Sequence, residues 1–121
     1  MAKEITTRAL TRRDLTNWYG REFTVTFRGT VVEEDGEVIG FGGYSYEGRY
    51  VKVFMEVHPD WKVSPKVMLR AVKPVLEEAK KKHRVLHAVA DNYDVAPGFL
   101  EHFGFRKMYD SDQGEVYKWA R

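Results

Sequence analysis

The chain contains no cysteine and no long apolar run. Without cysteine there are no disulfides, thiolate nucleophiles, cysteine-ligated zinc sites or iron-sulfur clusters. No stretch approaches the roughly 20 apolar residues of a membrane span, and residues 1–8 have no apolar core of the kind found in a signal peptide. We therefore expect a soluble, cytoplasmic protein that folds in a reducing compartment and has no membrane partner.

The sequence also lacks an excess of charge of one sign. Twenty Lys and Arg against eighteen Asp and Glu leave a formal net charge of +2. So small an excess gives no general case for nucleic acid as the main partner, and none is expected. Metal binding is not expected either, because no two histidines lie at i,i+4 positions of one predicted helix. These are His58, His83, His87 and His102.

Apolar residues are present in the amount that a folded domain needs. Of the 121 residues, 43% are hydrophobic and 14% are aromatic. A chain of this length removes about two-thirds of its unfolded surface from water on folding. We expect one domain over residues 1–121, with no disordered segment and no repeat.

Local patterns predict a strand over residues 5–10 and then a helix. Thr11 begins this helix with Asp14 three positions later, as in a capping box, and Gly20 ends it. A second strand is predicted over 23–32, because Phe23, Val25 and Phe27 alternate with the polar residues at 24, 26 and 28.

A three-strand meander follows from the turns. Asp35-Gly36 is a strong hairpin turn into a strand over 37–46, and the next turn leads into a strand over 50–57. Three glycines weaken the middle strand and indicate a bulge or the close approach of another backbone. They are Gly40, Gly42 and Gly43.

Residues 64–79 form the long helix of the prediction, with Ser64 at the N-cap and Pro65 at the first helical position. Pro74 lies inside it and predicts a kink or a break. The nearly continuous apolar run over 85–90 is typical of a central, parallel strand that is covered on both faces.

The remaining elements are a short helix over 95–103, ending at Gly104, and a hairpin of strands over 105–109 and 115–119. The full order is strand, helix, three strands, helix, strand, helix and two strands. This order places the strands at 50–57 and 85–90 side by side and parallel, with a right-handed connection. Any groove between them opens at their C-terminal ends.

Three stretches, 35–43, 57–62 and 92–105, occur in an order and spacing that resembles the GNAT acyltransferase superfamily. The resemblance implies an α/β (α+β) fold with a mixed, twisted sheet of about seven strands, splayed between the fourth and fifth. Acetyl-CoA enters this splay as cosubstrate, with its pantetheine arm along the strand that ends at Val57. The implied activity is transfer of the acetyl group to a primary amine, by direct attack, on a small molecule, a protein lysine or an N-terminus.

The family's pyrophosphate loop is altered here. Aligning Lys62 with the loop's basic residue puts Pro65 and Val67 where small residues belong, and Pro65 has no amide to donate. The positions left to hold the pyrophosphate are the Lys62 and Lys66 side chains and the amides at this helix start. We expect either weakened binding of CoA or a different path for its pyrophosphate. The cofactor residues implied by the resemblance are Val57, Lys62, Val63, Ser64, Lys66 and Asn92.

Two carboxylates are candidates for the chemistry. Glu56 lies near the end of the strand beside the proposed groove, where a general base would take a proton from the amine. The alternative is an outward strand glutamate paired with a neighbour. Asp91 follows the 85–90 strand and would orient the acceptor, although turn and cap chemistry is the preferred interpretation there.

The family's proton-donating tyrosine is replaced by Leu100. Tyr93 and Tyr109 are candidate substitutes, because a phenol can donate to sulfur, and packing is the competing interpretation for both. The basic run at 80–84 would meet a phosphate or nucleic acid, but a solvated helix end is the simpler explanation.

These departures leave a second hypothesis open. In its altered loop, missing tyrosine and short N-terminal region, the chain resembles the small acetyltransferase-like proteins of podoviruses, including the internal virion protein group. On this hypothesis the protein has lost transfer chemistry and acts in the host cytoplasm by binding a host or virion protein.

Overall fold

The computed structural model describes residues 4–58, 65–90 and 96–121. The elements follow the predicted order. They are β1 (Ile5–Ala9), α1 (Arg12–Tyr19), β2 (Thr26–Glu34), β3 (Glu37–Glu47), β4 (Tyr50–Val57), α2 (Pro65–Lys82), β5 (Val85–Ala90), α3 (Ala96–His102), β6 (Arg106–Ser111) and β7 (Gly114–Ala120). The strands form one seven-stranded mixed sheet in the order β1-β2-β3-β4-β5-β7-β6. The predicted α/β architecture is confirmed.

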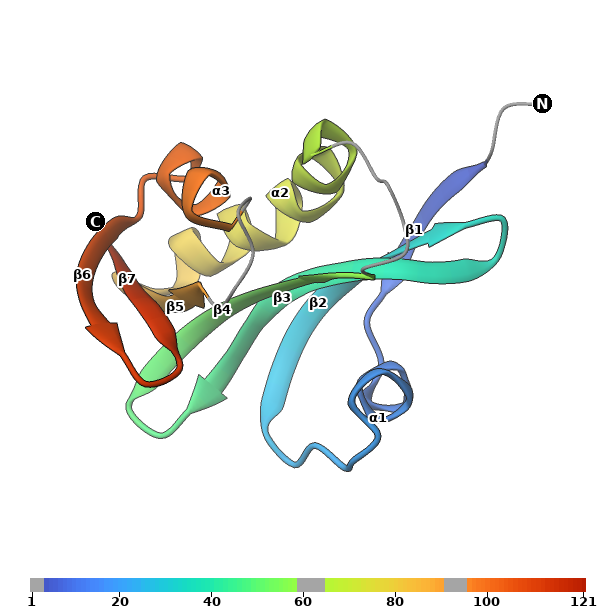
Figure 1. Ribbon diagram of the computed structural model, residues 1–121, viewed down its shortest axis with the longest axis horizontal. Helices are drawn as coiled ribbons and strands as arrows, with labels where there is room; N and C mark the ends of the chain where they lie inside the picture. The colour runs from blue at the N-terminus through green and yellow to red at the C-terminus, as the bar shows by residue number, and fades with distance from the viewer. Residues whose placement is uncertain (1–3, 59–64, 91–95) are drawn as a thin grey trace.

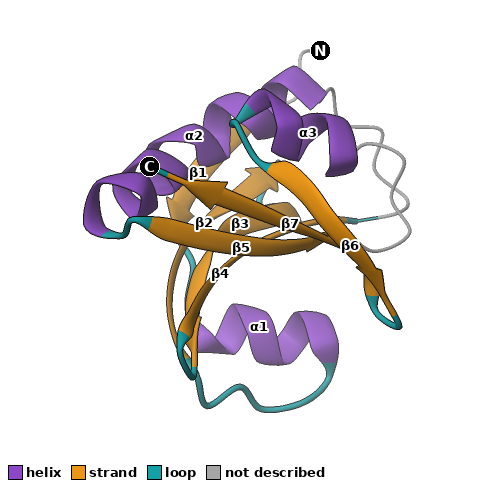
Figure 2. Cartoon of the chain, turned by 90° about the vertical axis from the view of Figure 1, so that its left-hand side faces the viewer, coloured by secondary structure: helices purple, strands orange, loops and turns teal. Residues whose placement is uncertain are grey.

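Helices cover both faces of the sheet. α2 and α3 lie on one face and α1 lies alone on the other (Figures 1 and 2). The larger core cluster joins the sheet to α2 and α3 through side chains such as Met68, Leu76 and Phe103. The smaller cluster, with Leu15 and Phe41 at its centre, lies beneath α1. No helix in the described ranges has the length and apolarity needed to cross a bilayer.

The local chemistry around α1 is as the sequence predicts. Thr11 and Asp14 form the capping box, and Gly20 ends the helix with a left-handed backbone at φ 73°. Arg8 adds a pair of hydrogen bonds from its guanidinium to the Asp14 carboxylate, at 2.7 and 2.8 Å. The junction between β1 and α1 is therefore fixed by a charged, bidentate contact as well as by the cap.

Close backbone approach explains two of the β3 glycines. A Cβ on Gly43 would lie 2.1 Å from the carbonyl oxygen of Arg28, and one on Gly40 would lie 2.7 Å from that of Glu56. The predicted irregularity is present as well, since the β2–β3 register shifts by one residue opposite Val32 and Glu33. Only glycine fits positions at which neighbouring strands come this close.

Three expectations are wrong in detail. β2 begins at Thr26, and residues 23–25 belong to the loop before it. α2 continues through Pro74 as one helix, with the exposed proline on its solvent side, so of the two predicted alternatives, a kink or a break, the break is wrong. β5 is central and parallel to β4, but Leu86 and Ala88 are buried while the alternate positions are not, so only one of its faces is fully covered.

β4 and β5 separate soon after they meet. Their parallel pairing comprises Lys52 with His87 and Val53 with Ala88. β4 then runs on to Val57, paired on its other edge with β3 over its whole length. The predicted splay between the fourth and fifth strands is therefore confirmed, and it opens toward the C-terminal end of β4 (Figure 1).

Candidate active site

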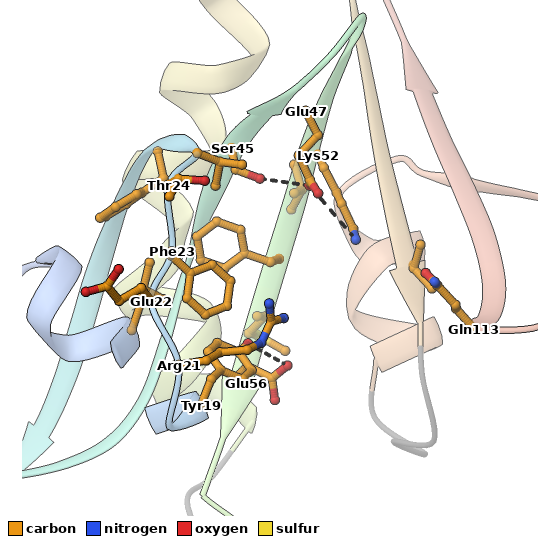
Figure 3. A pocket seen from close by; sticks show the side chains of 17 residues that line it. Tyr19, Arg21, Glu22, Phe23, Thr24, Ser45, Glu47, Lys52, Glu56 and Gln113 are labelled. Carbon is orange, nitrogen blue, oxygen red and sulfur yellow. Dashed lines mark hydrogen bonds and ion pairs between the residues drawn. The ribbon is translucent and has the colours of Figure 1, made fainter. Parts of the chain in front are cut away.

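A cavity of about 450 Å³ lies on the α1 side of the sheet, at the place where β4 and β5 separate. Its walls come from the end of α1, the loop before β2, the facing strands β3 and β4, β5 and the β6–β7 turn. Figure 3 shows the side chains that surround it. They include Leu15, Tyr19, Arg21, Glu22, Phe23, Phe27, Ser45, Glu47, Lys52, Phe54, Glu56, Val89 and Gln113.

Glu56 enters this cavity because of strand alternation. Val53, Met55 and Val57 of β4 belong to or pack against the α2 side cluster, so Phe54 and Glu56 point to the α1 side. There the Tyr19 hydroxyl donates to Glu56 Oε1 at 3.1 Å. The carboxylate is half-buried and is held by a phenol that belongs to a different element.

Tyr19 is itself held by aromatic neighbours. Its ring lies 4.9 Å from that of Phe23 and 6.2 Å from that of Phe41, measured between centroids. It also lies four residues after Leu15, which is buried beneath α1. Both residues therefore lie on the helix face that meets the sheet.

Arg12, at the start of α1, holds the loop between α1 and β2 through side-chain hydrogen bonds. Its guanidinium donates to the carbonyl oxygens of Phe23 and Val25 and lies 5.2 Å from the centroid of the Phe27 ring. Residues 23–25, which line the cavity, are thus fixed by side-chain hydrogen bonds in place of a strand ladder. These hydrogen bonds hold residues 23–25 in the loop, although the alternating pattern predicted that they belong to the strand.

The cavity has two chemically distinct ends. At the end near the β3–β4 turn, Glu47 Oε2 accepts from the Ser45 hydroxyl at 3.0 Å and lies 3.9 Å from Lys52 Nζ. Charge is therefore balanced locally at that end. At the other end Glu56 and Tyr19 face the guanidinium of Arg21, as Figure 3 shows. Lys52 and Glu56 are four residues apart on β4, a separation of about 13 Å along the strand.

The cofactor residues inferred from the sequence are only partly described. Val57 is the last residue of β4 and packs partly buried against the α2 side cluster. Lys66 is exposed in the first turn of α2. Lys62, Val63, Ser64, Asp91 and Asn92 lie outside the described residues, as does Tyr93.

The structure does not bring the other predicted tyrosine to the cavity. Tyr109 lies on the edge strand β6, which β7 and β5 separate from β4, and its side chain is 60% exposed. Leu100, at the position of the family's tyrosine, is buried in the main core between α3 and the sheet. Within the described ranges, Tyr19 is therefore the tyrosine that touches Glu56.

The basic run at the end of α2 is not uniformly solvated. Lys80 Nζ donates to the Phe103 carbonyl oxygen and lies 5.2 Å from the centroid of the Trp119 ring. Burial lowers the pKa of Lys80. Lys81 and Lys82 are exposed, as the sequence predicts. Lys80 is thus a packing residue, and the interpretation of the whole run as a solvated surface is wrong at this position.

Sequence reasoning identified Glu56 but missed the residues around it. Tyr19, Arg21 and Lys52 carry no recognisable motif, and each comes from a different segment. One signal was available for Tyr19. It lies four residues after the apolar Leu15, so both side chains fall on the same apolar face of the helix. The loop position of Arg21 had no such signal.

The free edge of β4 fits a pantetheine arm. Beyond Val53 no β5 residue is paired with β4 within the described residues, so the backbone amides and carbonyls of residues 54–57 that are not directed toward β3 face the splay without a ladder partner there. An extended chain that carries amide groups, as pantetheine does, can supply the missing hydrogen bonds. Glu56 belongs to this stretch of β4.

Several solved structures with this architecture are named as acetyltransferases. An N-acetyltransferase from Staphylococcus aureus has a TM-score of 0.70 at 14% identity, with 97% of this chain and 98% of that chain covered. A ribosomal-protein-alanine N-acetyltransferase from Escherichia coli has a TM-score of 0.67 at 14% identity, covering 97% and 94%. A Salmonella typhimurium protein, named as an acetyltransferase and solved with acetyl-CoA as its cofactor, has a TM-score of 0.66 at 19% identity, covering 96% and 93%.

The fold is the GNAT-like fold. Proteins assigned to the GNAT family are among the further matches. No protein-family model matches the sequence, and no curated protein matches it. At identities of 10 to 19% the likeness concerns the arrangement of the chain. The case for activity therefore depends on the cavity and the splay.

Proposed function

We propose that the protein is an acetyl-CoA-dependent N-acetyltransferase that acts on a primary amine. The observation that carries this proposal is the position of Glu56. Its carboxylate lies in a cavity on one side of β4, and the unpaired edge of the same strand faces the β4–β5 splay. An acceptor and an acyl donor can therefore meet at one strand.

The residues present support a direct attack. Glu56 would accept a proton from the acceptor's ammonium group, either directly or through water, and so generate the neutral amine that attacks. The nitrogen would then add to the acetyl carbon, the carbon–sulfur bond would break, and the leaving thiolate would take up the second proton that the nitrogen loses as the amide forms. Tyr19 would hold the Glu56 carboxylate in position through its hydroxyl.

The cofactor assignment follows the same geometry. Val57 and the neighbouring β4 backbone would hold pantetheine, and Lys66 would add charge near the pyrophosphate at the start of α2. Lys62, Val63, Ser64 and Asn92 remain sequence-based assignments to this role, and Asp91 remains one to acceptor orientation. Acetyl-CoA supplies the activated acetyl group, and no metal is required for this chemistry.

The test of Glu56 is release of free CoA in the presence of a panel of amines, for the wild type and for Glu56→Gln. Glutamine keeps the shape of the side chain but removes its basic oxygen. If Glu56 is the general base, this substitution should lower the rate roughly 100-fold with little change in acetyl-CoA affinity. Raising the pH should recover part of the lost rate, because more of the acceptor is then already neutral.

The matched control is Glu37→Gln, the same change on an exposed carboxylate at the start of β3. It should leave the rate unchanged. An active wild type with an equally active Glu56→Gln would remove Glu56 from the mechanism. A protein that acetylates nothing on the panel would favour the alternative function, binding of a host or virion protein.

A further inference from the structure

The charges at the Glu56 end of the cavity are of both signs. Arg21 extends from the loop before β2 toward β4, on the side where Tyr19 and Glu56 lie, whereas Glu22 points to the opposite side of the loop (Figure 3). An acceptor that places its amine at Glu56 therefore has a guanidinium beside it. That arrangement repels a second ammonium group and attracts an anion.

Arg21 is available to a ligand. Its guanidinium lies over the Phe23 ring, with Cζ 4.6 Å from the centroid, and the described residues give it no ion pair. This cation–π contact places the group beside the ring and leaves its N–H donors open to a ligand. Lys52, the other cation among the described residues that line the cavity, lies beside Glu47 at 3.9 Å. Within the described lining, Arg21 is thus the cation with an unused hydrogen-bonding edge at the reacting end.

Arg12 fixes the loop segment that carries Arg21. The hydrogen bonds from Arg12 to the carbonyls of Phe23 and Val25 fix the backbone directly after Arg21. On the other side Gly20 ends α1 with its amide bonded to the Thr16 carbonyl at 2.8 Å. The segment that carries Arg21 is therefore attached at both ends, as a preorganised binding group should be.

We infer that the acceptor is an amine that also carries a carboxylate, as an amino acid does, and that Arg21 binds this carboxylate while Glu56 receives the amine. This inference rests on the proposed function and names its substrate class. A guanidinium binds a carboxylate through two parallel hydrogen bonds, which a neutral amide cannot match. The aromatic wall of Phe23, Phe27 and Phe54 then faces the acceptor's side chain.

The experiment compares acceptors that differ in the carboxylate alone. The full-length protein is incubated with acetyl-CoA and an equimolar mixture of amino acids, their C-terminal amides and the corresponding decarboxylated amines, and acetylated products are quantified by mass spectrometry. We expect the free amino acids to be preferred by roughly tenfold or more, the size of a charge-assisted bidentate contact.

Variants assign the preference to one side chain. Arg21→Met keeps an unbranched stem but removes the guanidinium, and it should erase the preference for carboxylates. Arg21→Lys should keep part of it, because charge remains but the fork does not. Arg106→Met, on the exposed edge strand β6, is the control and should behave as the wild type.

Two results would overturn the inference: amides or decarboxylated amines used as readily as amino acids, or a carboxylate preference that survives Arg21→Met. If no acceptor is acetylated, it is the proposed function that fails. Calorimetry with the same three classes of acceptor then measures whether Arg21 binds a carboxylate, independently of acetyl transfer. Tighter binding of the carboxylates, lost in Arg21→Met, would sustain the carboxylate site, and equal or absent binding would end it.

Discussion

Individual side chains fix the helix that carries Tyr19. The Asp14 carboxylate accepts from the Arg8 guanidinium, from the backbone amide of Thr11 and from the Thr11 hydroxyl. Hydrogen bonding to Arg8 is the largest cause that lowers the pKa of Asp14 from 3.8 to about 2. Because the folded pKa lies below the unfolded one, this carboxylate stabilises the protein above about pH 4, and the contribution is lost as the pH falls from 4 to 2.

Asp14→Asn should therefore lower the free energy of unfolding by about 1 kcal/mol at pH 7, a figure discounted for the solvent exposure of Arg8. The difference from the wild type should shrink toward pH 2. Urea unfolding followed by tryptophan fluorescence at several pH values measures it. Asp112→Asn, in the exposed β6–β7 turn, is the control. A destabilisation that is equally large at pH 7 and pH 2.5 would contradict the assigned cause.

At the scale of elements, α2 and α3 meet through Lys80. Its ammonium group donates to the carbonyl of Phe103 and lies within 5.6 Å of the centroids of both the Phe103 and Trp119 rings. Lys80→Met keeps the apolar stem but removes the donor and the cation. It should cost about 1 to 2 kcal/mol of stability. Thermal unfolding checks the total, and faster amide exchange in α3 would locate the loss.

Lys81→Met is the comparison for that change, because Lys81 is the exposed neighbour on the same helix. It should shift stability by less than about 0.5 kcal/mol. Equal effects at the two positions would mean that the basic run acts only through its charge at the end of the helix.

Elements were predictable where local chemistry decides them. The Thr11–Asp14 cap and the Asp35-Gly36 turn depend on residues that are adjacent in sequence, and both form. The break allowed for at Pro74 does not form, because packing overrides a local rule. The helix continues since Met68, Val72 and Leu76 on its two sides bury one continuous face against the sheet, which offsets the roughly 3 kcal/mol that a proline costs.

The predictable parts of the site were those that strand alternation and the order of the elements determine. Alternation along β4 puts Glu56 on the face opposite Val57, and the parallel β4–β5 pair follows from the order of the elements. The partners of Glu56 were not predictable. Tyr19 and Arg21 reach β4 because a helix and a loop pack onto the sheet from about 35 residues away, and no pattern within either segment records that contact.

At the scale of the whole molecule, the sheet is two units joined along a short seam. Among the residues that the structure describes, the ladder pairing between β1–β4 and β5–β7 is limited to the brief parallel contact at Lys52 and Val53. Such an opening beside a cavity is where an extended donor and a small acceptor can approach one strand from its two sides. The central claim is that acetyl-CoA occupies this seam.

Calorimetric titration of the full-length protein with acetyl-CoA tests that claim most directly. We predict one site per chain with a dissociation constant below about 1 mM, equivalent to about 4 kcal/mol, and a matching rise in the unfolding temperature. Weaker binding than this scale would be consistent with no specific site. No heat and no thermal shift at millimolar acetyl-CoA would contradict the account, because a ligand that binds only the native state must raise its apparent stability.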